Sequence, residues 1–245
     1  RRVLFRSRKK SFFDVPPMFV GVMPCDDGNL ILSVEEREEI LQKYPTAKKF
    51  IKPFMSGEDF LKIKIRYCLW LKDFSLDKIK KFPEIYERVE KVRIFRENSR
   101  SEEHKKLAKK PHKFARSNFV EEKKIFIPML SSGNRKYIPI GFIEKNVVVS
   151  NLGSFIPNGD KFLFGILSSK VLMAWLKKCG SRFKSDYRFS ATLVYNTFPF
   201  PTPTETQREK ITATAEKILS VREKYFGWTL ATLYNEKTMP EDLRQ

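Results

Sequence analysis

The chain has 245 residues, 41% hydrophobic and 13% aromatic, so it is long and apolar enough to bury a core and is not expected to be disordered. Its 48 Lys and Arg residues outnumber its 29 Asp and Glu residues, giving a formal net charge of +19. A basic surface of this size favours a polyanionic partner, and duplex DNA is the densest common polyanion. RNA fits the charge equally well. A membrane surface is disfavoured because no strongly amphipathic helix has an all-basic polar face.

Composition also argues against metal and membrane-spanning classes. The longest apolar stretch, residues 162–176, is interrupted by polar residues and is too short to span a bilayer. The chain begins with Arg and lacks an apolar signal-peptide core, so we expect it to start inside a longer cytoplasmic polypeptide. Structural zinc is not expected, because the cysteines are few and far apart and only two histidines accompany them: Cys25, Cys68, Cys179, His104 and His112.

The N-terminal part predicts a linker and then a helix. Residues 1–13 are basic without a periodic apolar face, which is typical of a linker or the tail of a preceding domain. Ser33 and Glu36 form a capping-box pattern that predicts a helix to about Lys43. Pro45 cannot continue that helix.

The next elements are a strand and a longer helix. Residues 65–71 are rich in β-branched and aromatic side chains and predict a buried strand. Pro83 suits the first turn of the helix that follows. Residues 98–118 are polar and basic and predict a loop or a frayed helix. The apolar face of the helix has helical spacing: Phe82, Ile85, Val89 and Val92.

The middle of the chain predicts a strand-rich region. Three short strands are expected over residues 124–130, 137–143 and 147–149. Residues 133–134, Gly-Asn, suit a turn between the first two strands. A strong helix is expected from about residue 161 to residue 178, ending at a glycine.

The last part predicts a loop, a strand and a long helix. Residues 181–190 form a basic polar loop, residues 192–198 predict a strand, and residues 199–203 a proline-rich connector. Thr204 and Gln207 open the final helix. Its apolar stripe is Ile211, Ala215, Ile218, Val221 and Tyr225, against which a short tail with Trp228, Leu230, Leu233 and Tyr234 can pack. The pattern therefore predicts an α+β (mixed α/β) fold, strand-rich first and helical towards the C-terminus.

The sequence shows no catalytic motif. It has no Gly-rich loop for a phosphate or cofactor and no Asn/Asp-Pro-Pro-aromatic tetrad of an amino-methyltransferase. Glu121 and Lys123 have the Glu-x-Lys spacing of some metal-dependent nucleases but lack an upstream Asp partner, so a solvated loop is favoured. We therefore expect no enzymatic activity from this chain alone, and neither a catalytic nor a metal-binding residue in it.

The segment Lys184-Ser-Asp186-Tyr-Arg188 carries the most specific chemistry. In an extended segment alternate residues point the same way, so its three charged side chains would share one face. In the DNA major groove, Lys or Arg can donate to guanine O6 and N7, and Asp can accept from the cytosine N4 amino group. The alternative is a surface salt bridge of Asp186 with Lys184 or Arg188, which these residues alone favour.

Flanking polar residues are candidates for contacts with the DNA backbone or next to the reading residues. They are Asn134, Arg135 and Lys136 at a turn, with Lys177, Lys178, Arg182, Ser185, Tyr187 and Ser190 around the loop. Phosphate contacts fix register and carry no sequence information. For any one of these residues a solvated turn is about as well supported.

Several segments in order resemble the MmeI-like family of single-chain type II restriction-modification enzymes. They cover about residue 15 to the end of the chain. Each is weak alone, but the ordered set is specific: MPCDDGNLILS (23–33), RYCLWL (66–71), RKYIPIGF (135–142), FGILSS (164–169), KSDYRFS (184–190), VYNTFP (194–199), TLATLYN (229–235) and TMP (238–240).

The resemblance implies an architecture and a function. In that family a nuclease, a helical spacer, an adenine-N6 methyltransferase, a target recognition domain and a C-terminal helical region share one polypeptide. Residues 1–14 would be a linker from the methyltransferase domain, residues 15–158 the target recognition domain, and residues 159–245 the helical region with the base-reading loop. S-adenosylmethionine and Mg²⁺ would belong to domains outside this chain. The resemblance makes Lys184 and Asp186 a base-reading pair and Arg188 a further base contact.

Three functions remain in this order. The first is sequence-specific recognition of double-stranded DNA in a bacterial restriction-modification enzyme, with the methyltransferase domain of the same polypeptide as partner. The second is non-specific DNA or RNA binding through charge alone, for which Asp186 is dispensable. The third is a nuclease built on Glu121 and Lys123, which predicts metal-dependent cleavage by this chain.

Overall fold

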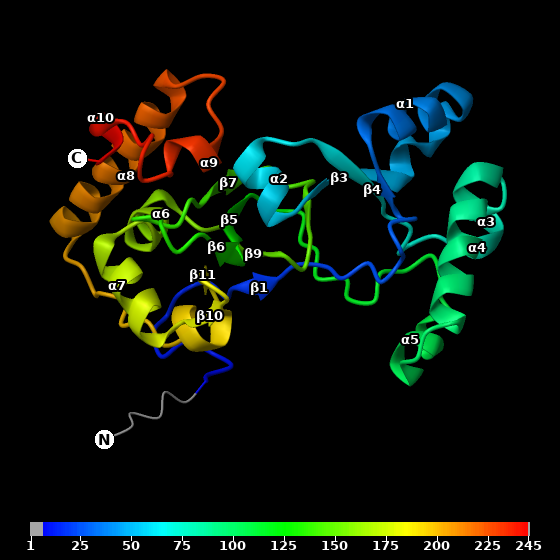
Figure 1. The fold of residues 1–245 in the computed structure, drawn as a ribbon, viewed down its shortest axis with the longest axis horizontal. Coiled ribbons are helices and arrows are strands. Elements are labelled where there is room, and N and C mark those ends of the chain that lie inside the picture. Colours follow the sequence, from blue (N-terminus) through cyan, green and yellow to red (C-terminus); the bar gives the residue numbers. More distant parts are fainter. Residues whose placement is uncertain (1–6, 245) are drawn as a thin grey trace.

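The computed structural model of the chain describes residues 7–244 and arranges them in two lobes (Figure 1). Each lobe surrounds its own cluster of buried hydrophobic residues. The helical lobe, residues 30–55, 66–116 and 148–149, contains the helices drawn on the right of Figure 1. The main lobe contains the remaining residues, including the C-terminal helices.

The main lobe is centred on a four-stranded antiparallel sheet with the order β1-β9-β5-β7. Ile125 and Ile127 on the central strand pack into the larger cluster, whereas Phe126 packs into a smaller cluster on the opposite face. Alternation along the strand therefore gives this sheet two buried faces. The strands are β1 (Phe19–Val20), β9 (Gly153–Pro157), β5 (Lys124–Pro128) and β7 (Gly141–Ile143).

The helical lobe has a second four-stranded sheet with the order β2-β4-β3-β8, whose β3–β8 pair is parallel. Ile85, Val89 and Val92 are fully buried and belong to the hydrophobic cluster of this lobe. The strands are β2 (Ile31–Leu32), β4 (Arg66–Leu69), β3 (Ile51–Met55) and β8 (Val148–Val149). The helices are α1 (Val34–Lys43), the 3₁₀ helix η1 (Pro45–Phe50), α3 (Leu76–Ile79), α4 (Pro83–Glu97) and α5 (Glu102–Leu107).

Helices cover the side of the main lobe away from the helical lobe (Figure 1). A Cβ added to Gly165 of α6 would lie 3.0 Å from Ile211 and 3.3 Å from Ala215 of α8, so glycine permits this close helix contact. The covering helices are α6 (Lys161–Leu167), α7 (Lys170–Cys179) and α8 (Glu205–Lys224), followed by α9 (Leu230–Leu233) and α10 (Glu241–Arg244). Helix α2 (Gly57–Lys62) contacts α9 and lies towards the helical lobe (Figure 1).

A small three-stranded sheet forms a third sheet, within the main lobe. Its order is β10-β11-β6, and both pairs are antiparallel. Its strands are β10 (Ser181–Phe183), β11 (Asp186–Arg188) and β6 (Leu130–Ser131). A short π-helical turn, η2 (Ala191–Tyr195), follows and leads into the proline-rich connector before α8.

The predicted α+β fold class is confirmed, and so are the helix starts read from local signals. Ser33 and Thr204 each accept the backbone N–H three residues on, and each has a complete capping box. Pro83 occupies the first turn of α4. These starts depend on neighbours within one helical turn, which the sequence contains in full.

Two predictions around residues 161–198 are wrong. The single helix expected over 161–178 is two helices, because Ser169 accepts the Leu172 N–H at 3.1 Å and so caps a new N-terminus. The strand expected over 192–198 is replaced by the turn η2 and a following bend, with Val194 and Tyr195 buried in the main core. Tertiary packing there overrides the strand preference of β-branched residues.

Other elements differ from the sequence-based reading. Residues 181–190, expected as a loop, contain the hairpin β10–β11. Strands β3 and β9 were not predicted, because Pro53 lies within β3, and β9 begins with Gly-Ser and ends at Pro157, a turn-like composition. Both gain their strand partners from distant segments.

The predicted N-terminal linker lies partly outside the described residues, since residues 1–6 are not described. Its remainder has no helix or strand up to residue 14. Arg8 is nevertheless attached to the main lobe: its N–H donates to Thr192 O at 2.9 Å, and its carbonyl accepts from Asn196 Nδ2 at 2.9 Å. The domain boundary at residue 158 stays a prediction.

Candidate nucleic-acid interface

The hairpin β10–β11 turns through two residues, Lys184 and Ser185. Phe183 pairs with Asp186, and Ser181 pairs with Arg188. Lys184 has a φ of 54°, so it lies in the left-handed region at the turn. The sequence-based expectation that residues 184–188 form one extended stretch is therefore wrong. Lys184 stands at the hairpin tip, while Asp186 and Arg188 lie on the strand.

One face of this hairpin, here called the open face, consists of Ser181, Phe183, Asp186 and Arg188. Side chains alternate along each strand, and paired residues share a face. Phe183 is 58% exposed, Arg188 is exposed and Asp186 is half-buried. The open face thus presents an acceptor, a cation and an aromatic ring.

The opposite face of the hairpin is held by packing. Tyr187 is only 6% exposed and belongs to the main core. The Arg182 guanidinium lies 4.4 Å from the Tyr187 ring centroid and donates to Tyr187 Oη at 3.1 Å and to Ser185 O at 3.2 Å. These contacts stabilise the hairpin tip from behind. The predicted roles of Arg182, Ser185 and Tyr187 in DNA contacts stay predictions.

A second turn, residues 132–136, lies against the hairpin tip. Gly133 packs so closely that an added Cβ would lie 2.4 Å from Ser185 O. Arg135 donates to Ser131 Oγ at 3.3 Å. Burial lowers the pKa of Arg135, and the nearby negative charge of Asp186 opposes that shift. The structure therefore brings Arg135 into the electrostatic neighbourhood of Asp186, 51 positions further along the chain.

The surface salt bridge considered for Asp186 is not formed. Across residues 7–244, no ion pair joins Asp186 to Lys184 or to Arg188. The carboxylate is instead half-buried on a short, paired strand. Its acceptor sites stay available to a ligand, although whether they read a base remains a prediction.

The remaining candidate residues fall into two groups. Lys177 and Lys178 are exposed in the last turn of α7, and Asn134 and Lys136 are exposed in the turn 132–136. Ser190 is different, because it caps η2 and accepts the Leu193 N–H at 3.4 Å. If Ser190 contacts DNA as predicted, it does so in addition to capping η2.

Phe183 was missed by the sequence reading. A large apolar residue inside an otherwise polar, basic segment was the available signal. Only the register of the hairpin shows that Phe183 lies directly opposite Asp186. An exposed aromatic ring at that place can contact a thymine methyl group or a base face.

The two side chains of the Glu121-x-Lys123 pattern are exposed, and each has its own ion-pair partner. Glu121 pairs with Lys52 at 3.7 Å, and Lys123 pairs with Glu144 at 4.0 Å. The Glu121 and Lys123 side chains are 61% and 75% exposed. Within the part of the chain that the structure describes, no three His, Cys, Asp or Glu side chains are grouped to hold a metal ion. Over the same residues, no helix has the length and apolar character needed to cross a bilayer.

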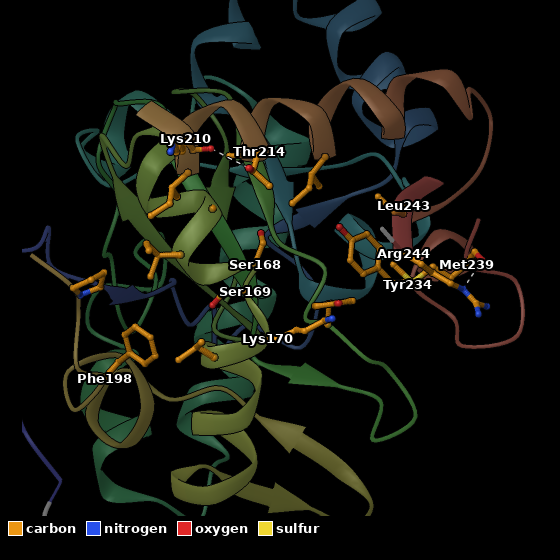
Figure 2. A pocket seen from close by; sticks show the side chains of 18 of the residues that line it. Ser168, Ser169, Lys170, Phe198, Lys210, Thr214, Tyr234, Met239, Leu243 and Arg244 are labelled. Carbon is orange, nitrogen blue, oxygen red and sulfur yellow. Dashed lines mark hydrogen bonds between the residues drawn. The ribbon is translucent and has the colours of Figure 1, made fainter. Parts of the chain in front are cut away.

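The sequence also gave no hint of a large apolar cavity next to the C-terminal helices (Figure 2). Its volume is about 580 Å³, and it lies between α6, α7, α8 and the C-terminal tail. The labelled side chains around it are Ser168, Ser169, Lys170, Phe198, Lys210, Thr214, Tyr234, Met239, Leu243 and Arg244. None of the residues on the hairpin's open face lines this cavity.

The chain has an α+β fold, and its main lobe carries a hairpin with exposed charged residues. Residues 1–202 match the family described as the MmeI target recognition domain, and residues 203–245 match the family described as the MmeI C-terminal domain. The chain belongs to the MmeI target recognition family and includes the C-terminal domain that follows it.

Two relatives extend this assignment. The chain is 38% identical over 242 residues to a Bacillus subtilis (strain 168) protein named DNA methyltransferase A, covering 99% of the chain and 27% of that protein. A solved structure of the type IIL restriction-modification enzyme MmeI in complex with DNA superposes with a TM-score of 0.95 at 36% identity, covering 100% of the chain and 33% of that structure. The chain thus spans about a quarter to a third of the relatives it matches.

Proposed function

We propose that this chain selects a short sequence of double-stranded DNA on behalf of a larger restriction-modification enzyme. Domains outside the chain would then carry out adenine-N6 methylation and cleavage at the selected site. The observation that carries the proposal is the open face of the hairpin, where Asp186 and Arg188 stand side by side without an ion pair between them in the described chain. Simple attraction to phosphates gives no reason to place a carboxylate at a DNA surface.

Base reading follows from the chemistry of these side chains. Asp186 would accept from a cytosine N4 amino group, and Arg188 would donate to guanine O6 and N7. Lys184 at the hairpin tip adds a donor whose reach differs from that of a strand residue. Backbone contacts would come from the exposed cations and the amide around the hairpin: Lys177, Lys178, Lys136 and Asn134.

In this proposal the catalytic groups belong to domains outside the chain. S-adenosylmethionine and Mg²⁺ would bind to the methyltransferase and nuclease domains of a longer, cytoplasmic bacterial polypeptide. The residues described here do not fit a metal ion, because they contain no grouped set of His, Cys, Asp or Glu ligands.

The test is methylation-motif mapping by sequencing DNA from cells that carry the full-length gene. We expect the double variant Lys184→Asp with Asp186→Lys to change or relax the motif at one base pair, because it exchanges a donor for an acceptor. If the motif and the extent of methylation both stay unchanged, the readout assignment is wrong.

Two further variants keep the test decisive if the exchange abolishes methylation. Asp186→Asn is nearly isosteric and should relax the motif at the same position while methylation continues. Lys178→Gln serves as the matched control on a predicted phosphate contact, and it should weaken binding without changing the motif. If single-stranded DNA or RNA competes as well as the specific duplex, the chain is a non-specific basic binder.

A further inference from the structure

A second basic surface lies in the helical lobe, far along the chain from the hairpin. Residues 105–116, here called the basic segment, comprise the end of α5 and the loop after it. Within these 12 residues there are six cations and no Asp or Glu. Five of the cations are exposed, and the exception, Lys113, is half-buried. They are Lys105, Lys106, Lys109, Lys110, Lys113 and Arg116.

The charges of the basic segment are mostly unpaired. Among the described residues, only Lys105 has an ion pair, with Glu102 at 2.7 Å. Elsewhere in the same lobe the cations of α1, and those of α4 apart from the buried Arg96, have carboxylate partners, such as Lys91 with Glu87 at 2.8 Å and Arg88 with Glu36. Unpaired like charges repel one another, and an approaching polyanion relieves that repulsion.

The backbone of the basic segment is fixed from beneath by Arg96, whose side chain is fully buried. The Arg96 guanidinium donates to Leu107 O at 3.1 Å, Lys110 O at 3.2 Å and Lys113 O at 2.8 Å. A loop pinned at three points holds its lysines in one arrangement. Less conformational freedom is then lost when a ligand binds.

The basic segment and the hairpin lie on the same side of the molecule as drawn in Figure 1. There α5 is at the lower end of the helical lobe, and β10 is in the lower half of the main lobe. Helix α1, which carries four Glu and two basic residues, lies at the upper end of the helical lobe. Within this lobe, the net negative helix α1 therefore lies at the opposite end from α5.

We infer that the basic segment binds the phosphate backbone of DNA flanking the bases that the hairpin reads. This inference rests on the proposed function. Lysines act as point charges on phosphates. The basic segment has no carboxylate and no exposed aromatic side chain that could distinguish bases. It supplies affinity and fixes the direction of the duplex across both lobes, whereas the hairpin supplies sequence preference.

The test measures the dissociation constants of the full-length protein for its specific duplex and for a scrambled duplex between 50 and 200 mM salt. The triple variant Lys106→Gln, Lys109→Gln, Lys110→Gln should weaken both complexes by the same factor. The slope of log affinity against log salt should become shallower by about 2.7, because each lost phosphate contact contributes about 0.9. The methylation motif should not change.

The matched control neutralises three lysines of the same lobe that have carboxylate partners: Lys43, Lys80 and Lys91. Its slope should stay within about one unit of wild type. If the triple variant keeps the wild-type affinity and slope while the wild type still prefers its site, the inference is wrong and the proposed function stands. If the wild type shows no preference for any duplex sequence, the proposed function itself fails. Shortening the duplex on the flanking side should reduce wild-type affinity and leave the triple variant nearly unaffected.

Discussion

Arg96→Met should loosen the basic segment, because one guanidinium serves backbone carbonyls from two separate stretches of chain. Besides its three contacts in the basic segment, Arg96 donates to Pro24 O and Cys25 O at 2.9 and 2.8 Å. Burial lowers the pKa of Arg96, and the nearby Asp26 carboxylate opposes that shift. Methionine fills similar space but can donate to none of these carbonyls.

The size of the effect follows from the carbonyls that lose their donor. Leu107 O and Lys110 O each keep a backbone N–H partner at 3.0 Å. Over residues 7–244, Pro24 O, Cys25 O and Lys113 O have no other donor. An unsatisfied buried acceptor costs about 1–3 kcal/mol, and these three lie in half-buried residues. We therefore take the lower end and expect a loss of about 3 kcal/mol, roughly a hundredfold in the opening equilibrium.

Hydrogen–deuterium exchange of the full-length protein measures this local opening. Amides in residues 22–27 and 105–116 should exchange about a hundredfold faster in Arg96→Met. Arg93→Met is the matched control on the same helix, because Arg93 is 39% exposed and, within residues 7–244, forms ion pairs only with Glu90 and Glu97. Such surface pairs contribute about 0–1 kcal/mol. Equal exchange in the two variants would refute the role assigned to Arg96, and Arg96→Lys should lie between Arg96→Met and wild type.

Three further changes have defined outcomes. Gly133→Ala should weaken specific DNA binding on the order of tenfold and leave the melting temperature nearly unchanged. The reason is that the new Cβ would lie 2.4 Å from Ser185 O and must displace the hairpin tip. Unchanged binding would contradict this prediction. Ser169→Ala should destabilise α7 by about 1 kcal/mol in denaturant titrations, since it removes an N-cap. Ser168→Ala should be neutral, because the buried Ser168 Oγ has no partner among the described residues. Burial lowers the pKa of Lys124 from 10.5 to about 8, so the folded state loses this proton at a lower pH than the unfolded state does. The free energy of unfolding of wild type should therefore rise between pH 8 and 10.5 relative to that of Lys124→Met. Parallel stability curves for the two proteins would contradict that sign.

Local sequence signals predicted the parts of the fold that depend on near neighbours. The capping boxes at Ser33 and Thr204 and the spacing of Ile85, Val89 and Val92 identified α1, α8 and α4. Each signal is complete within one or a few helical turns, so no distant residue is needed to read it. The ordered motifs likewise led to the family that the comparisons show.

The arrangement of the candidate site could not be predicted from short-range sequence patterns. Alternation in an extended chain predicted a shared face for Lys184, Asp186 and Arg188, but the turn at Lys184 breaks that alternation. Strand β11 exists because it pairs with both β10 and β6, and β6 comes from about 55 residues earlier in the chain. Phe183 consequently joins Asp186 on the open face, which no periodicity within the segment indicates.

By itself the sequence determined the charge, the α+β class, the principal helices and the family, because these follow from composition and short-range patterns. Only the tertiary structure decided which side chains stand together. It placed Arg135 near Asp186, packed Gly133 against Ser185, and fixed the basic segment on the buried Arg96. Strand pairing and burial join residues far apart in the chain, and their free energy depends on three-dimensional neighbours that a linear pattern does not contain.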